Sequence, residues 1–332
     1  MTNNECNNEC GTNFDGFLIS DTVRTGFISG ATFKNKPIQY SVVDELAVFE
    51  GCIVLGTVEE MEKKAAAVQA GEEDVDQTRG VFISDQRYRW PDGIVPYEID
   101  PNLPNQSRVT DAIAHWQEKT HIRFVQRTSS NASQYANYIY FLPADGCWSH
   151  IGMTGGKQDI GLGDGCSTGN TIHEIGHALG LWHEQSREDR DRHIQILWEN
   201  INPEHAHNFN QQITDGDDHG PYDYDSIMHY GATAFSNNGQ PTIVTLSGRP
   251  IGQRNSLSDT DIATIKFIYP VAVPQSRPYT IQPGDTLYLI AERELHNNDR
   301  WREIMKTPTG GLLPEEEAKN LQPGQVVYLP LT

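Results

Sequence analysis

The fold of this chain is decided by Thr171-Ile172-His173-Glu174-Ile175-Gly176-His177-Ala178-Leu179-Gly180-Leu181-Trp182-His183. His173 and His177 are four residues apart, so a helix of about 3.6 residues per turn presents both imidazoles on one face. Two imidazole nitrogens placed in this way can bind one zinc ion. Glu174 follows the first histidine and lies beside the metal, where a carboxylate can take a proton from zinc-bound water. The spacing therefore predicts a zinc-binding helix that carries its own general base.

The residues after this pair predict a third zinc ligand. Gly180 can adopt a positive φ and end the helix, which lets the chain turn back and bring His183 to the metal. Three neutral histidines leave the fourth tetrahedral position open, and an open position is typical of a catalytic rather than a structural zinc site. The alternative, a surface helix that happens to carry histidines, requires the glycine and the third histidine to coincide by chance.

Two later segments resemble the astacin branch of the metzincin metalloproteases. Residues 183–191, which read HEQSREDRD, resemble that family's sequence after the third histidine, and residues 222–230, which read YDYDSIMHY, resemble its Met-turn. The resemblance implies that Met228 forms a hydrophobic floor under the zinc, a role compatible with plain core filling. It also implies that the Tyr230 phenol approaches the metal, where it can donate to the oxyanion formed when water attacks a peptide carbonyl. We expect His229 to be structural, because three histidines already serve as ligands.

The same resemblance implies an α+β fold, with a metzincin catalytic domain of mixed sheet and zinc-binding helix over residues 80–270. Residues 89–99 are similar to the opening turn and strand of astacin domains. Cys147 and Cys166 resemble a disulfide pair of that domain, which favours an oxidising compartment. Residues 138–142 read as a strand and resemble the sheet-edge strand along which metzincins align an extended substrate.

Hydrophobic spacing predicts three further elements of this domain. These are a helix at Ser107–Thr120, a strand at Ile122–Gln126, and a helix that Ser258 caps and that runs to Tyr269.

Residues 1–79 are expected to be a prosegment that keeps the enzyme latent. Within it, residues 38–43 read as a strand and residues 58–69 as a short helix. The alternative is a disordered acidic tail. In the astacin family the new amino terminus of the mature form contacts the glutamate after the third histidine, here Glu184, and alignment places that terminus near residues 80–81.

The segment Phe49-Glu50-Gly51-Cys52 departs from the family at one position. Many astacin prosegments carry F-x-G-D, whose aspartate ligates the zinc and holds the enzyme inactive, and here Cys52 stands in its place. A thiolate is a better zinc ligand than a carboxylate, and Gly51 lets the backbone approach the cleft closely. We therefore expect a cysteine switch, in which Cys52 binds zinc in the latent form and displaces the water. The alternative is that Cys52 is a small apolar residue in the run before Ile53-Val54-Leu55.

A proline-punctuated linker over residues 271–278 precedes a segment, residues 279–332, that resembles a LysM domain. The resemblance rests on YTIQPGDTLYLIA at its start and LQPGQVVYLP near its end. It implies a βααβ module, with its second helix around Trp301 and Ile304, that binds N-acetylglucosamine polymers such as peptidoglycan or chitin. The alternative is a packing module without a ligand.

Composition limits the partners of the 332-residue chain. Its net charge of −20 disfavours binding to a phosphate backbone, so we expect no nucleic-acid partner. No apolar run approaches the length that spans a bilayer. The amino terminus lacks the basic and apolar regions of a signal peptide, so a signal was removed, export is unconventional, or the protein stays inside. The expected disulfide favours a secreted or cell-wall-associated protein, and Cys6 and Cys10 either pair with each other or stay reduced.

Together these features predict a latent zinc endopeptidase that holds one Zn²⁺ per chain and cleaves protein or peptide substrates. Two alternatives stay open. One is a cell-wall metallopeptidase that cuts peptidoglycan cross-bridges and is held in place by its LysM module. The other is a non-enzymatic glycan-binding protein whose zinc domain is a relic, which is disfavoured because no ligand and no base is missing.

Overall fold

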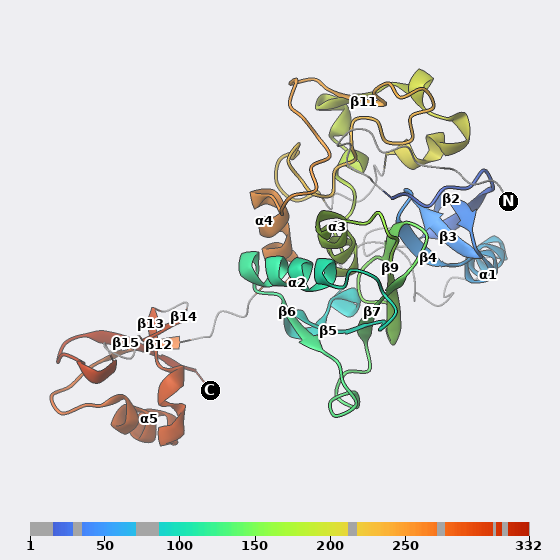
Figure 1. The fold of residues 1–332 in the computed structure, drawn as a ribbon. Helices are drawn as coiled ribbons and strands as arrows, with labels where there is room; N and C mark the ends of the chain where they lie inside the picture. Colours follow the sequence, from blue (N-terminus) through green and yellow to red (C-terminus); the bar gives the residue numbers. More distant parts are fainter. Residues whose placement is uncertain are drawn as a thin grey trace. The chain divides into compact units, whose positions relative to one another are not determined.

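The computed structural model describes seven ranges of the chain, which Figure 1 colours along the sequence. They are residues 16–28, 35–70, 86–211, 218–270, 276–307, 310–313 and 318–331. These ranges divide between two compact units, Met1–Tyr269 and Pro270–Thr332. The predicted boundary between residues 79 and 80, the amino terminus expected near residues 80–81, Cys6 and Cys10 all lie outside the described residues.

A nine-stranded mixed sheet runs through the first unit, in the spatial order β1-β2-β3-β4-β8-β9-β7-β5-β6. Its strands are β1 (Val23–Ile28), β2 (Lys36–Val43), β3 (Leu46–Phe49), β4 (Ile53–Thr57), β5 (Ile94–Ile99), β6 (Arg123–Gln126), β7 (Tyr138–Pro143), β8 (Cys147–His150) and β9 (Lys157–Leu162). Strands β1 to β4 pair antiparallel, and β4 then pairs in parallel with β8. The N-terminal segment, which the structure describes over residues 16–28 and 35–70, therefore shares one sheet with the strands that follow it.

The strand predicted to align an extended substrate is not an edge strand, so that prediction was wrong. Residues 138–142 lie in β7, which β9 and β5 flank. Within residues 86–211 the outermost strand toward the N-terminal segment is β8, and β4 covers its open side. Strand order depends on pairing between distant segments, and the alternation of side chains along one strand does not reveal it.

The α-helices predicted for the first unit are confirmed. They are α1 (Val58–Gln69), α2 (Ser107–Lys119), α3 (Thr168–Leu179) and α4 (Asp259–Ile268). Three of them begin at a capping box, in which the side chain of Thr57, Ser167 or Ser258 accepts from the backbone N–H three residues on. α2 lies beside α3 (Figure 1). The Trp116 indole of α2 donates to Ile172 O of α3 at 3.1 Å.

Shorter elements of this unit are η1 (Gln86–Tyr88), η2 (Pro91–Gly93), η3 (Glu184–Ser186), η4 (Arg190–Arg192), η5 (Trp198–Asn200), η6 (Pro203–Phe209), and the two-stranded sheet of β10 (Ile194–Ile196) and β11 (Ile243–Thr245).

The N-terminal segment packs onto the rest of the first unit. Phe49 and Val54 are buried in an apolar cluster that also contains Trp148 of β8. The Trp182 ring meets the Phe49 ring edge to face, with centroids 5.8 Å apart. Residues 35–70 are therefore not a disordered acidic tail, because burial of apolar side chains stabilises them against the domain.

The second unit contains β12 (Ser276–Thr280), α5 (Leu287–Leu295), η7 (Asn298–Glu303), β13 (Met305–Thr307), β14 (Gly310–Leu312) and β15 (Val326–Pro330). Its four strands form one sheet in the order β12-β15-β13-β14. The predicted second helix is present at Trp301, but as the short 3₁₀ segment η7, which Asn297 caps and which ends before the buried Ile304. A hairpin that was not predicted, β13–β14, follows it. The predicted linker is shorter than expected, because β12 begins within it at Ser276.

No helix in the described part of the chain combines the length and the apolar character that crossing a membrane requires.

Candidate metal centre

Helix α3 and the turn after it bring the three predicted histidines together. Gly180 ends the helix with a φ of 101°, a left-handed conformation that favours glycine. The Nε2 atoms of His173 and His177 lie 3.1 Å apart. After the turn, the His183 ring returns to 4.7 Å from that of His177, measured between centroids. All three imidazoles are buried.

Each imidazole is oriented through its Nδ1 atom by an oxygen acceptor. The pairs are His173 with Ile227 O at 2.9 Å, His177 with Leu181 O at 2.7 Å, and His183 with Glu50 Oε2 at 2.8 Å. A proton on each Nδ1 leaves each Nε2 as the nitrogen that can bind a metal. Burial lowers the pKa of all three imidazoles well below the ordinary value, so they are neutral, as metal ligands must be.

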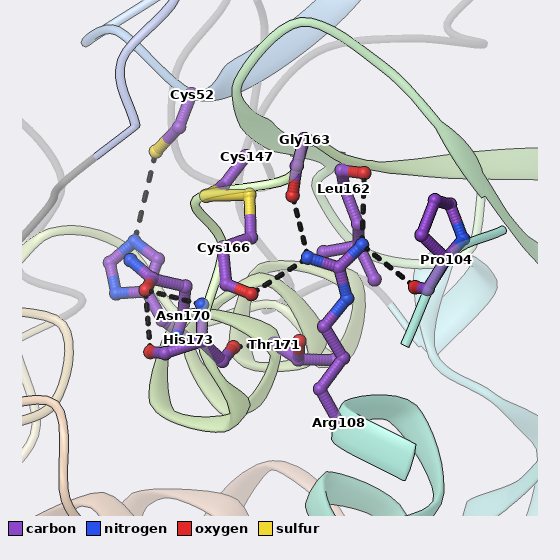
Figure 2. The surroundings of a disulfide bond; sticks show 11 residues. Cys52, Pro104, Arg108, Cys147, Leu162, Gly163, Cys166, Asn170, Thr171 and His173 are labelled. Carbon is purple, nitrogen blue, oxygen red and sulfur yellow. Dashed lines mark hydrogen bonds between the residues drawn. A yellow bond between two sulfur atoms is a disulfide. The ribbon is translucent and has the colours of Figure 1, made fainter. Parts of the chain in front are cut away.

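Cys52 lies against the same three nitrogens. Its buried Sγ is 3.7 Å from His173 Nε2 and 3.3 Å from Nε2 of both His177 and His183. Figure 2 draws the contact with His173. The four donor atoms lie within 4.8 Å of one another. A tetrahedral zinc ion with bonds of about 2.0–2.1 Å to nitrogen and about 2.3 Å to sulfur separates its donors by about 3.3–3.6 Å. The donor set therefore fits one zinc ion.

Glu174 lies on α3, directly after the first of the three histidines. Its Oε2 atom is buried and has no hydrogen-bond partner among the described residues. Burial raises the pKa of this carboxyl well above its usual value. A buried carboxyl oxygen without a partner calls for one, and a proton donor bound at the metal would supply it.

Met228 and His229 occupy the turn beneath the helix. A Cβ atom added at Gly176 would lie 2.8 Å from Met228 Sδ, so glycine leaves the room that this sulfur needs. His229 uses both ring nitrogens elsewhere: Nε2 bonds to the Tyr222 hydroxyl at 2.7 Å and Nδ1 to Tyr230 O at 2.8 Å. Burial lowers the pKa of His229 to about 4, so its ring is a neutral packing element.

Glu50 is a site residue that the sequence analysis did not single out. Its Oε2 holds His183, its Oε1 accepts from the Ser186 hydroxyl at 2.7 Å, and its main-chain oxygen accepts from the Tyr230 hydroxyl at 2.7 Å. The Tyr230 ring also packs 4.7 Å from that of His183. The sequence signal for it was an acidic residue at the end of the apolar run at residues 46–49. A carboxylate buried with such a run must be paired, and its partner can belong to a functional site.

Glu184, expected to meet the mature amino terminus, is engaged elsewhere. Its Oε1 accepts from the Asp223 N–H at 2.7 Å, and Arg187 Nε lies 3.5 Å away. Burial raises the pKa of Glu184 to about 8. The amino terminus itself would come from residues that the structure does not describe.

Cys147 and Cys166 form a disulfide, which Figure 2 shows. Their Cα atoms are 5.9 Å apart. Next to it, buried Arg108 of α2 donates to the carbonyls of Leu162, Gly163 and Cys166. These bonds and the disulfide fix the loop between β9 and α3, and thus the start of the helix that carries the histidines.

The profile of the peptidase family described as Astacin matches residues 82–270. The chain belongs to the astacin family. The match includes the three histidines, Glu174 and Tyr230, whereas Cys52 and Glu50 precede it. This astacin-family domain is a zinc metallopeptidase domain, and the metal for which its histidines are arranged is zinc.

Known proteins similar to the chain include Blastula protease 10 of Paracentrotus lividus, which is 43% identical over 193 residues, 54% of this chain and 32% of that protein. Zinc metalloproteinase nas-15 of Caenorhabditis elegans is 39% identical over 212 residues, 60% of this chain and 36% of that protein. Among solved structures, High choriolytic enzyme 1, a hatching enzyme zinc-protease from Oryzias latipes, is 38% identical, with a TM-score of 0.49 over 55% of this chain and 92% of that chain. The chain spans about a third of the length of the two curated relatives.

Proposed function

We propose that this chain is the latent form of a zinc endopeptidase that acts on protein or peptide substrates. His173, His177 and His183 would hold the ion, and Cys52 would fill the fourth position until the N-terminal segment is removed. The observation that carries the proposal is the Cys52 Sγ atom, which lies within 3.7 Å of all three Nε2 atoms.

Zinc bound in such a site lowers the pKa of a water ligand and polarises a carbonyl group. Glu174 takes the proton of the attacking water and delivers it to the leaving amine. The Tyr230 hydroxyl donates to the carbonyl oxygen as negative charge develops on it. The carbonyls of Ile227 and Leu181 keep the Nε2 atoms of His173 and His177 directed at the metal position. Met228 provides an apolar surface below that position.

Three contacts support latency in the uncleaved chain. The Cys52 sulfur would take the fourth position in place of the water. The Tyr230 hydroxyl donates its hydrogen bond to Glu50 O, so it is not available to a substrate carbonyl. Strand β4 pairs with β8, so the main-chain groups that an extended substrate would use are covered. Removal of one segment therefore frees the nucleophile position, the oxyanion donor and the peptide-binding strand together.

The test of this function is zinc analysis combined with peptidase assays before and after limited trypsin treatment. We expect about one zinc per chain in both forms, as a four-donor site and a three-histidine site both bind it, and casein cleavage only after treatment. Sequencing of the active form should find its amino terminus within residues 77–84. Glu184→Gln should lower the stability of the cleaved form more than that of the uncleaved form, because only the cleaved form offers an ammonium group to Glu184. Full activity of the uncleaved chain, or a trypsin-treated form that retains zinc but cuts no peptide, would contradict the proposal.

A second activity is proposed for the C-terminal unit, as a LysM-like module that binds peptidoglycan or chitin. The rings of Tyr288 and Trp301 stack 5.6 Å apart, and Tyr288 is half exposed. Exposed aromatic faces suit the apolar faces of sugar rings. The full chain should sediment with one of these insoluble polymers, and Tyr288→Ala should bind less. A chain that binds neither polymer is a packing module, and turnover of purified cell wall rather than casein would favour the cell-wall peptidase.

We also propose a secreted or cell-wall-associated location, which the Cys147–Cys166 disulfide supports because such bonds persist in oxidising compartments. Mass spectrometry of the native protein after thiol labelling should find both cysteines oxidised. Labelling of both would contradict this location.

A further inference from the structure

An aromatic cluster adjoins the metal centre, and a side chain of the N-terminal segment occupies it. The cluster consists of the rings of Phe209, Tyr230 and Phe235. Phe17 stacks on Phe235, with centroids 4.4 Å apart and planes 10° apart, and lies 5.0 Å from the Tyr230 ring. Phe209 lies 5.8 Å from both Tyr230 and Phe235.

The aromatic cluster is next to the expected zinc ligand. A Cβ atom at Gly51 would lie 2.7 Å from Phe235 Cζ and 2.8 Å from Phe17 Cδ1. Gly51 directly precedes Cys52, so the backbone beside the sulfur already touches both the cluster and its occupant. A side chain in this cluster is therefore a neighbour of the reacting centre.

The segment that carries Phe17 is held as a bound peptide would be. The Cys147 N–H of β8 donates to Gly16 O at 2.8 Å, and the Leu18 N–H donates to Gly51 O at 2.7 Å. Main-chain hydrogen bonds on both sides fix the backbone, and the side chain between them enters the aromatic cluster. An extended substrate presents its side chains to specificity pockets in the same manner.

Phe235 adopts an unusual backbone conformation that points to a role for its ring. Its φ is 52°, in the left-handed region that a bulky residue rarely occupies. Such strain persists where the surroundings hold the residue, and it gathers at binding sites. The Phe235 ring contacts Phe17, the two other rings of the cluster and His205 at 5.8 Å, so the strained position serves to present this ring.

We propose, on the basis of the endopeptidase function above, that the aromatic cluster is a substrate subsite beside the scissile bond. It takes an aromatic or large apolar side chain, because stacked rings favour a planar apolar occupant. In the latent chain Phe17 fills it in place of the substrate. Phe235 is then a residue that determines specificity.

The test uses the released, zinc-loaded enzyme and its Glu174→Gln variant, which should hold peptides without cutting them. Extended peptides that place Phe, Leu, Ala, Asp or Arg at one position at a time are scored for cleavage by the first and for binding by the second. We expect one position beside the scissile bond to favour Phe or Leu over Ala by at least about tenfold in both readouts. Phe235→Ala should bring this ratio close to one.

Two variants control this measurement. Phe235→Leu keeps an apolar side chain and should retain part of the preference, so the result does not depend on the folding of the alanine variant. Phe267→Ala removes an exposed ring on α4 and should leave the preference unchanged. Indifference to the side chain at every position, a preference for Asp or Arg beside the scissile bond, or a Phe preference that survives Phe235→Ala would overturn the subsite. A wild-type enzyme that cuts no peptide, while its Glu174→Gln form still selects Phe, would overturn the endopeptidase function and leave the subsite standing.

Discussion

The imidazoles of the metal centre are held in two different ways. His173 and His177 donate to main-chain carbonyls within the astacin-family domain. His183 donates instead to the carboxylate of Glu50, which belongs to the segment ahead of that domain. The first two contacts would remain after the segment leaves, whereas the third would leave with it.

If the N-terminal segment is removed as proposed, the centre has a permanent half, which is His173, His177, His183 and Glu174 with the carbonyls inside the domain, and a removable half, which is Cys52 and Glu50. Groups that hold the second nitrogen of a histidine ligand typically change metal affinity by about 10- to 100-fold. We therefore expect the latent chain to bind zinc more tightly than the released enzyme, in addition to any contribution from Cys52. The predictions below test which half of the centre each property depends on, from the largest expected effect to the smallest.

Glu174→Gln tests whether catalysis resides in the permanent half. An amide nitrogen cannot accept the proton of the attacking water, so peptidase activity of the released enzyme should fall by at least ~10²-fold. Zinc content should not change, because Glu174 is not one of the four donors. His177→Ala is the contrasting variant, and its zinc stoichiometry should fall well below one. Near-normal turnover by Glu174→Gln would remove it from the role of base.

Cys52→Ala tests whether the removable half blocks the site through its sulfur. Without the thiolate a water molecule can take the fourth position, so the uncleaved chain should be partly active or cleave itself. In the wild-type chain Cys52 should resist alkylation until a chelator removes the zinc. Rapid alkylation with zinc retained, together with an alanine variant as latent as the wild type, would leave Cys52 as a packing residue.

Glu50→Ala tests the removable support directly. It leaves the Nδ1–H of His183 without its acceptor, so zinc affinity of the latent chain, measured by chelator competition, should fall about tenfold. Glu45→Ala, at an exposed position of the same segment, is the matched control and should have no effect. Equal zinc affinity in the Glu50→Ala and Glu45→Ala chains would show that His183 needs no support from Glu50.

The smallest expected effect concerns pH and a contact away from the metal. His207 Nε2 lies 3.1 Å from the Ser41 hydroxyl of β2, its Nδ1 lies 3.1 Å from Glu204 O, and His205 is close by. Burial lowers the pKa of His207 below its ordinary 6.5, so the unfolded chain binds this proton more readily than the folded one. Stability from this group is therefore present above pH 6.5 and lost as the pH falls below it.

Thermal unfolding of the latent chain at pH 7.5 and at pH 5.5 checks this prediction. His207→Gln should reduce the acid-induced loss of Tm by no more than about 2–4 °C. His296→Gln, at an exposed position of the C-terminal unit, is the control and should behave as the wild type. An identical loss in all three chains would exclude His207 as a contributor.

The permanent half of the centre could be predicted from sequence because its information is local. The spacing of His173, His177 and Gly180 specifies a helix face and a turn, and the capping residues specify where the helix begins. The removable half could be predicted only in part. Cys52 stood at a position of a known pattern. Glu50 lies just before β4, whose pairing with β8 places it, and Phe17 is held by main-chain bonds of its neighbours to Cys147 and Gly51. No local pattern encodes these contacts.

The same limit explains the errors elsewhere in the fold. The alternation in residues 138–142 predicted a strand but not its neighbours, because strand order is a property of the whole sheet. In the C-terminal unit, the apolar Trp301 and Ile304 suggested a helix. Asn297 starts only a 3₁₀ segment there, and Ile304 lies beyond its end, buried with apolar residues of α5 and β15.

If the chain is a latent enzyme as proposed, the shared sheet would make cutting and activation two separate events. A break in the chain between α1 and β5 would not by itself remove the pairing of β4 with β8 or the packing of Phe49 against Trp182. The cut protein would then be a noncovalent complex of two fragments, and its activity would depend on the dissociation of one from the other. The freed fragment would act as an inhibitor in trans, so activity should appear more fully as the cut protein is diluted.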